Sequence, residues 1–235
     1  MERNFEEKGQ ATILEEGEIF FFYRPRADSG ISGAEAEEGQ IFMVLHPLRK
    51  SRYRLIHLGK QYPPALKKSG PRIQASIDKV MASLDELRAE LVEQESWSGN
   101  RGKRARPAAL QVGEGIYALL KYRDNTHLVY ALDDSIRENG LLEEMGIAPE
   151  GGYTTSVRNP DTSDASGNAK HPDFPRHLLE RFRGRESIPI DPIEFLNEEG
   201  AELLLTGISN DPMEDLGIEF NSRNGSRTDH SRGQI

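Results

Sequence analysis

Three short apolar runs occupy the first part of the chain, and each one is closed by proline or glycine. The runs are Ile19–Tyr23, Ile41–Leu45 and Tyr53–Leu58. The first run is continuous rather than alternating, which indicates a strand that is buried on both faces, or a central strand. Proline ends pairing because it has no N–H to donate to a sheet ladder. The short spacing between the runs favours antiparallel connections over crossover helices.

A different pattern follows in residues 72–94, where apolar side chains recur every three or four positions. They are Ile73, Ile77, Val80, Met81, Leu84, Leu87, Leu91 and Val92. This spacing places them in one stripe along a helix, and Pro71 suits the first turn of that helix. We expect the stripe to pack on the protein's own sheet, although a face that binds a partner is the alternative.

Strand patterns return in the second half of the chain. Ile116–Leu120 and Thr126–Leu132 predict a β-hairpin, because a polar turn separates them. Two further strands are predicted at Gly152–Val157 and Glu202–Thr206. The fold class that follows is α+β: a mixed, mainly antiparallel sheet of about six or seven strands, covered by one long amphipathic helix and several short helices. An open barrel is the alternative.

The chain has no long linker, so we expect a single domain. Residues 1–16 are polar and acidic and predict a flexible leader. Residues 17–220 form the α+β domain in this interpretation. Residues 221–235 are rich in Ser, Arg, Asn and Gly, which is typical of a disordered tail.

Several of these segments together resemble a known family. The series begins with Gly17–Pro25 (Gly-Glu-Ile-Phe-Phe-Phe-Tyr-Arg-Pro) and continues with Val112–Tyr117 and Ser156–Pro160. In this order the motifs resemble those of a widespread uncharacterised family, some of whose eukaryotic members are labelled "BTB/POZ domain-containing" or "BTB domain transcription factor". The resemblance covers roughly residues 14–220. It implies no established activity, cofactor or partner.

Composition narrows the classes of protein that remain. The chain has no cysteine, which excludes disulfides, thiolate catalysis and cysteine-ligated metals. No apolar run approaches the roughly 20 residues of a membrane span, and no signal peptide is visible. We therefore expect a protein that does not contact a membrane. Its expected location is the cytoplasm, or the nucleus and cytoplasm in a eukaryote. The net charge of −9 repels nucleic acid and anionic lipid as a whole, so any anion-binding surface must be local.

The sequence shows none of the common catalytic motifs. It has no phosphate-binding Gly-x4-Gly-Lys-Ser/Thr loop, no Gly-x-Ser-x-Gly and no His-Glu-x-x-His. Gly113 and Gly115 flank a glutamate at the start of a strand, which indicates tight backbone geometry rather than a ligand loop. We therefore expect no cofactor, no metal and no catalytic residue, and lean away from an enzyme.

Basic residues are segregated along the chain. From Pro47 to Arg72 there are eight basic residues and no acidic one, and a second basic segment follows at residues 101–106. The candidate anion-binding residues in these two segments are Arg49, Lys50, Arg52, Arg54, Lys60, Arg101, Lys103, Arg104 and Arg106. If the segments meet, their donors form an anion site. Ordinary pairing with surface carboxylates such as Glu86, Glu90 and Glu93 is the alternative.

Three hypotheses of function follow. The first is a non-catalytic module that binds another macromolecule, either protein or nucleic acid. The second is a nucleic-acid or phospholigand binder that uses segments 49–72 and 101–106. The third is an enzyme whose site forms only in three dimensions.

Overall fold

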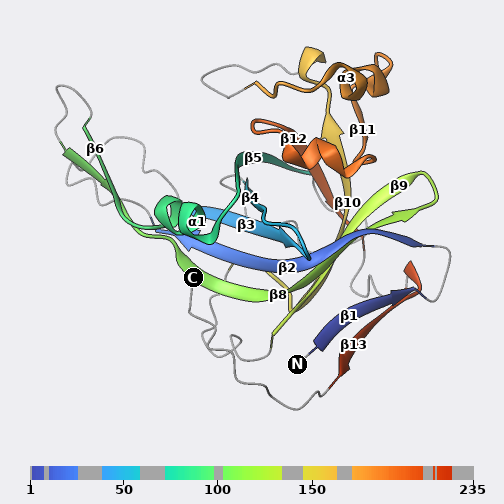
Figure 1. Cartoon of the computed structure of the whole chain (residues 1–235), viewed down its shortest axis with the longest axis horizontal. Coiled ribbons are helices and arrows are strands. Elements are labelled where there is room, and N and C mark those ends of the chain that lie inside the picture. Colours follow the sequence, from blue (N-terminus) through green and yellow to red (C-terminus); the bar gives the residue numbers. More distant parts are fainter. Residues whose placement is uncertain are drawn as a thin grey trace.

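The chain folds into a closed, antiparallel barrel of eight strands with one further strand added to it (Figure 1). The computed structural model describes residues 2–7, 11–25, 39–58, 72–97, 103–133, 145–162, 171–208, 214 and 216–223. The barrel strands follow the order β10-β12-β5-β4-β3-β2-β8-β9, and β9 pairs with β10 to close the ring. The added strand, β11, pairs with the end of β10.

The elements have the following bounds. The strands are β1 (Glu2–Glu7), β2 (Thr12–Arg24), β3 (Gln40–Pro47), β4 (Tyr53–His57), β5 (Ile73–Met81), β6 (Gln94–Trp97), β7 (Lys103–Arg106), β8 (Leu110–Tyr122), β9 (Asn125–Leu132), β10 (Glu150–Arg158), β11 (Ser187–Pro189), β12 (Glu202–Gly207) and β13 (Ile218–Arg223). The helices are α1 (Leu84–Leu91), α3 (Arg176–Phe182) and the 3₁₀ turns η3 (Pro160–Thr162) and η4 (Ile193–Asn197).

The apolar side chains fall into an interior core and two outer layers. Alternate residues of a strand point to opposite faces, so Ile19 and Phe21 face the interior while Phe22 lies outside. On the outside, α1 covers Phe22 with Leu87 and Leu91. Burial on both faces explains the continuous apolar run of β2, and this prediction is confirmed.

The α+β fold class with one long helix is wrong. Residues 72–94 form β5, the eight-residue helix α1 and β6 instead. Ile73 and Ile77 lie four residues apart, and that spacing places side chains on one face in a strand as well as in a helix. The helix begins only at Leu84, after the N-cap residue Ser83, whose hydroxyl accepts from the backbone N–H of Glu86. The open-barrel alternative came closer, but this barrel is closed.

Other segments agree with the sequence patterns. The first two predicted runs lie within β2 and β3, and the third, Tyr53–Leu58, extends one residue beyond β4. The predicted hairpin is β8–β9. The boundary expected at residue 17 falls inside β2, and residues 2–7 form β1, which pairs with β13. Of the expected tail, residues 221–223 belong to β13 and the rest lies outside the described residues.

Two glycines allow the long strands β2 and β8 to approach their neighbours closely. A Cβ on Gly115 would lie 2.1 Å from the backbone oxygen of Ala131 in β9. A Cβ on Gly17 would lie 2.1 Å from the backbone oxygen of His46 in β3. The tight backbone geometry predicted at Gly115 is therefore confirmed.

Within the described ranges, no helix combines the length and the apolar character that crossing a membrane requires. The expected cytoplasmic location stays a prediction.

Candidate functional site

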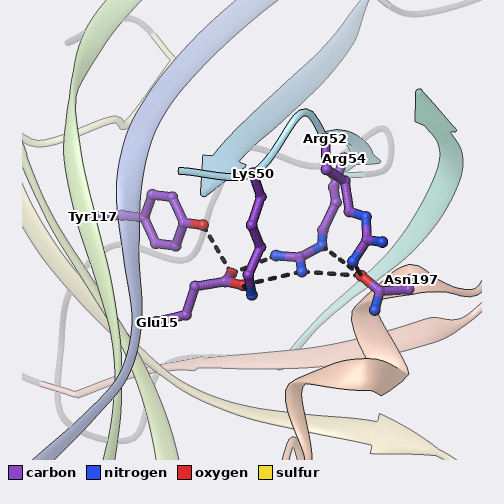
Figure 2. Close-up of polar contacts among 6 residues, drawn as sticks. All are labelled: Glu15, Lys50, Arg52, Arg54, Tyr117 and Asn197. Atoms are coloured by element: carbon purple, nitrogen blue, oxygen red, sulfur yellow. Dashed lines mark hydrogen bonds and ion pairs between the residues drawn. The ribbon is translucent and has the colours of Figure 1, made fainter. Parts of the chain in front are cut away.

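Six polar residues gather at one end of the barrel, around a carboxylate on its inner wall (Figure 2). We call them the mouth cluster: Glu15, Lys50, Arg52, Arg54, Tyr117 and Asn197. Three barrel strands contribute to it, namely β2, β4 and β8. The rest comes from the turn between β3 and β4 and from the last residue of η4.

The backbone of β2 turns Glu15 inward. The pairing of β2 with β8 shifts register between Ile13 and Glu15, which is the mark of a β-bulge. The bulge places Glu15 opposite Leu119, with only 3% of its side chain exposed. The Arg54 side chain is fully buried beside it. A charge buried this deeply requires a partner of opposite sign and further hydrogen bonds.

Four donors surround the Glu15 carboxylate. Arg54 donates from Nη1 to Oε1 and from Nη2 to Oε2, the second bond measuring 3.1 Å. The Tyr117 hydroxyl donates to Oε1 over 2.9 Å. The Lys50 ammonium donates to Oε2 over 3.3 Å. Each carboxylate oxygen therefore accepts two hydrogen bonds, which fills its two lone pairs.

These contacts fix the protonation states. Burial alone would raise the pKa of Glu15, but the hydrogen bonds and charge of Arg54, with the bonds from Tyr117 and Lys50, hold that pKa below its ordinary value. Burial, followed by the Glu15 charge, raises the pKa of Tyr117 well above its ordinary value. An ionised, fully occupied carboxylate and a protonated phenol do not serve as a general base or a nucleophile.

Asn197 joins the two arginines of the cluster. Its side-chain oxygen accepts from Arg52 Nη1 at 2.8 Å and from Arg54 Nε and Nη2 at 3.2 and 3.0 Å. Only the amide oxygen suits this position, because the amide nitrogen would face three donors. Two guanidinium groups thus share one neutral acceptor.

The charges of the mouth cluster do not balance. Lys50, Arg52 and Arg54 carry three positive charges, and Glu15 carries the single negative charge, which leaves a net charge of +2. Among the residues that the structure describes, no carboxylate forms an ion pair with Arg52. The Lys50 side chain is 53% exposed, so this excess charge reaches solvent.

Arg49 adds a further positive charge beside the cluster. It is exposed, and its backbone adopts a φ of 61°, a left-handed conformation that side chains rarely take. The tight turn around it is closed by a hydrogen bond from Lys50 N–H to the oxygen of Pro47. This turn directs Lys50 toward Glu15.

The described residues of the two basic segments do not meet in one cluster. Arg49, Lys50, Arg52 and Arg54 lie together at the mouth, whereas Arg106 forms an ion pair with Glu90 of α1, at 3.3 Å on the outside of the barrel. Lys103 and Arg104 are placed only as backbone positions of β7. Lys60 and Arg101 lie outside the described residues. The Arg106 contact matches the surface pairing considered as the alternative.

Sequence reasoning missed three members of the cluster. Glu15 lies in a segment expected to be a leader. Tyr117 ends the motif Val112–Tyr117, to which the sequence assigns no role, and Asn197 belongs to no recognisable motif. The only signal for Glu15 was its place just before a strongly apolar run, which suits the start of a strand as well as the end of a leader. In the described part of the chain, no group of three or more His, Asp or Glu is arranged to hold a metal ion.

Comparisons with protein-family models, with curated proteins and with solved structures found no match to this chain. The family resemblance drawn from the sequence motifs therefore stays a prediction.

Proposed function

We propose that this protein is a non-catalytic binding module whose ligand carries phosphate groups, and that the mouth cluster receives them. The observation that carries the proposal is the excess of two positive charges around Glu15, with Lys50 and Arg52 on the solvent side. Arginine and lysine are the side chains that proteins use most to hold phosphate oxygens.

The contacts within the cluster support binding without catalysis. Glu15 is occupied by four donors and Tyr117 remains protonated, so neither takes a proton from a ligand. Arg54 is held between Glu15 and Asn197, which makes it a fixed positive charge behind the site. Arg52 is half-buried, and its side-chain partner among the described residues is a neutral acceptor, so a phosphate oxygen improves its pairing.

The charge of the whole chain favours a small ligand over a long polyanion. A net charge of −9 opposes the binding of an extended nucleic acid, because its phosphates come within the Debye length of about 8–10 Å of acidic surface as well as of the mouth. A compact phosphate ester meets mainly the local positive field of the mouth. A small phospholigand is therefore the primary candidate, and a nucleic acid is the second outcome of the test.

The test is equilibrium binding of two probes, inorganic pyrophosphate and a fluorescein-labelled single-stranded oligonucleotide. We expect saturable binding of pyrophosphate that weakens as sodium chloride rises from 50 to about 300 mM, because screening reduces phosphate contacts. Saturable binding of the oligonucleotide instead would identify a nucleic-acid ligand. If neither probe binds, the proposal is contradicted.

A matched pair of variants locates the binding. Arg49 and Arg183 are both exposed and both have a left-handed backbone, with φ of 61° and 48°. Glycine adopts this conformation without strain, so Arg49→Gly and Arg183→Gly remove a charge at little cost in stability. Arg49→Gly should weaken pyrophosphate binding by about threefold to fivefold, the size of one exposed charge contact. Arg183→Gly should leave it unchanged, and an equal effect of both variants would mean that binding is not at the mouth.

A further inference from the structure

Three N–H donors of the mouth cluster converge on one neutral oxygen atom. The oxygen is Oδ1 of Asn197, which accepts from Arg52 Nη1 at 2.8 Å and from Arg54 Nε and Nη2 at 3.2 and 3.0 Å (Figure 2). A carbonyl oxygen has two lone pairs, so it serves two donors well and three poorly. Guanidinium groups form their strongest hydrogen bonds with the anionic oxygens of carboxylate and phosphate groups. The point that Oδ1 occupies therefore suits an anionic oxygen better than an amide.

The donors of Arg54 keep their direction without Asn197. The Arg54 side chain is fully buried, and it donates from Nη1 and Nη2 to the two oxygens of Glu15. This paired contact fixes the plane of the guanidinium group, so Nε and the second hydrogen of Nη2 stay directed at the point that Oδ1 occupies. This part of the anion position is built before a ligand arrives, which lowers the cost of binding.

Asn197 is the last residue of η4, whose backbone is anchored in the core. Phe195 and Leu196 are 0% and 1% exposed, and the rings of Phe195 and Phe182 have their centres 5.6 Å apart. Asn197 itself is half-buried, as is Arg52. A change of the Asn197 rotamer therefore removes Oδ1 from the arginines while η4 stays in place.

The excess charge of the mouth cluster indicates which phosphate group fits. Lys50, Arg52 and Arg54 outnumber the single carboxylate of Glu15 by two positive charges. A terminal phosphate group, which has one ester or anhydride bond, carries a charge of about −1.5 to −2 at pH 7 and presents three free oxygens. A phosphodiester carries about one negative charge. Of the two, the terminal group comes closer to balancing the excess.

From these observations we infer that Oδ1 of Asn197 occupies the subsite for one oxygen of a terminal phosphate group. The ligand displaces the Asn197 side chain, and Arg52 and Arg54 then donate to the phosphate oxygen. Asn197 is thus a competitor of the ligand, and it sets the affinity of the mouth. The inference rests on the phosphate-bearing ligand proposed above, and it specifies that ligand as a phosphate monoester or a terminal diphosphate rather than a phosphodiester.

The first experiment is calorimetric titration of pyrophosphate into the full chain and into two variants of Asn197. Asn197→Asp places a carboxylate on the subsite and should weaken binding by at least about tenfold, because the ligand must displace a charged acceptor. Asn197→Ala vacates the subsite and should tighten binding by about threefold to tenfold. Without ligand, Asn197→Ala should unfold at a lower temperature than the wild type, because the two arginines lose their acceptor. A merely structural asparagine would lose stability and affinity together.

A control variant makes the same chemical change at the other end of the barrel. Gln40, the first residue of β3, pairs with Arg24, the last residue of β2, whereas Glu15 lies near the start of β2. The length of β2 between Glu15 and Arg24 is roughly 30 Å, which exceeds the Debye length of about 8–10 Å. Gln40 is half-buried like Asn197, so Gln40→Glu also converts a half-buried amide into a carboxylate. It should leave pyrophosphate binding unchanged, and a loss as large as that of Asn197→Asp would overturn the inference.

The second experiment compares methyl phosphate, which is a monoester, with dimethyl phosphate, which is a diester. We expect dimethyl phosphate to bind the wild type at least about tenfold more weakly than methyl phosphate. Equal binding of the two compounds would overturn the assigned ligand class. Unchanged pyrophosphate binding in Asn197→Asp, or binding to Asn197→Ala that is no tighter than to the wild type, would overturn the role of Asn197. These results leave the function proposed for the mouth intact, whereas the absence of pyrophosphate binding to the wild type would contradict the small phospholigand itself.

Discussion

Glu15 and Arg54 form a buried ion pair that spans strand β3 on the inside of the barrel. Glu15 lies on β2 and Arg54 on β4, and β3 separates these two strands in the sheet. Lys50, Tyr117 and Asn197 supply the remaining hydrogen bonds of the pair. The pair therefore links four elements that are far apart in the sequence, and it also provides the fixed charges behind the proposed ligand site.

Removing one member of the pair should destabilise the fold strongly. Glu15→Gln leaves the buried Arg54 guanidinium without its counter-charge, which costs about 3–5 kcal/mol of unfolding free energy. The double variant Glu15→Gln/Arg54→Met should lose less than the sum of the two single variants. Urea denaturation at pH 7 measures all three, and strictly additive losses would show that the two side chains are not coupled.

The same pair predicts sensitivity to acid. Because the pKa of Glu15 in the folded protein is below its ordinary value of 4.5, the carboxylate contributes stability that is complete above that value. This contribution is lost as the pH falls through the lower pKa of the folded state. Stability measured between pH 6 and pH 3 should therefore fall more steeply in the wild type than in Glu15→Gln. Parallel curves would contradict the assigned role of Glu15.

His127 predicts a second pH effect in a different range. Burial lowers its pKa from 6.5 to about 4, so the folded protein holds the ring neutral while the unfolded chain takes up a proton below pH 6.5. The neutral His127 ring contributes fully to the free energy of unfolding above pH 6.5. This contribution falls as the pH drops toward 4, by at most about 3 kcal/mol. His127→Gln should flatten the curve of unfolding free energy in this window. A histidine NMR titration that gives an ordinary pKa for His127 would remove the basis of the prediction.

Gly115 predicts a backbone constraint in the barrel wall. Alanine at this position would place its Cβ 2.1 Å from the Ala131 oxygen and 2.7 Å from the Leu132 Cα, so β8 and β9 must separate. We expect Gly115→Ala to lose about 3 kcal/mol or more. The control is Gly184→Ala, where no atom lies within 4 Å and only the positive φ of 74° opposes the substitution, at about 1–2 kcal/mol. Thermal unfolding compares the two, and equal losses would argue against the close approach.

The sequence predicted strands whose buried side chains are apolar. It did not predict the part of a strand whose buried side chain is polar. Ile19–Tyr23 predicted β2 because the run is buried on both faces. The preceding part of β2 was missed, because Glu15 is buried by hydrogen bonds and charge rather than by apolar character. Segment 72–94 was misread because its four-residue spacing suits both a strand and a helix.

The closure of the barrel and the composition of the mouth depend on contacts that no local pattern records. β9 and β10 pair across a segment of the chain with no strand signal, and that pairing converts a sheet into a ring. The basic segment at residues 49–54 was visible in the sequence as charge without acids. The carboxylate that pairs with it among the described residues, Glu15, lies on β2, 35 residues before Lys50.

The central claim is that the excess positive charge of the mouth cluster binds a phosphate-bearing ligand. The most direct measurement is calorimetric titration of pyrophosphate into the wild type and into the double variant Lys50→Gln/Arg52→Gln, with thermal unfolding as a check on the fold. We predict saturable binding to the wild type and binding at least about tenfold weaker in the folded double variant, since two charged contacts are lost. Equal affinity of the two proteins, or no binding to the wild type, would contradict the claim.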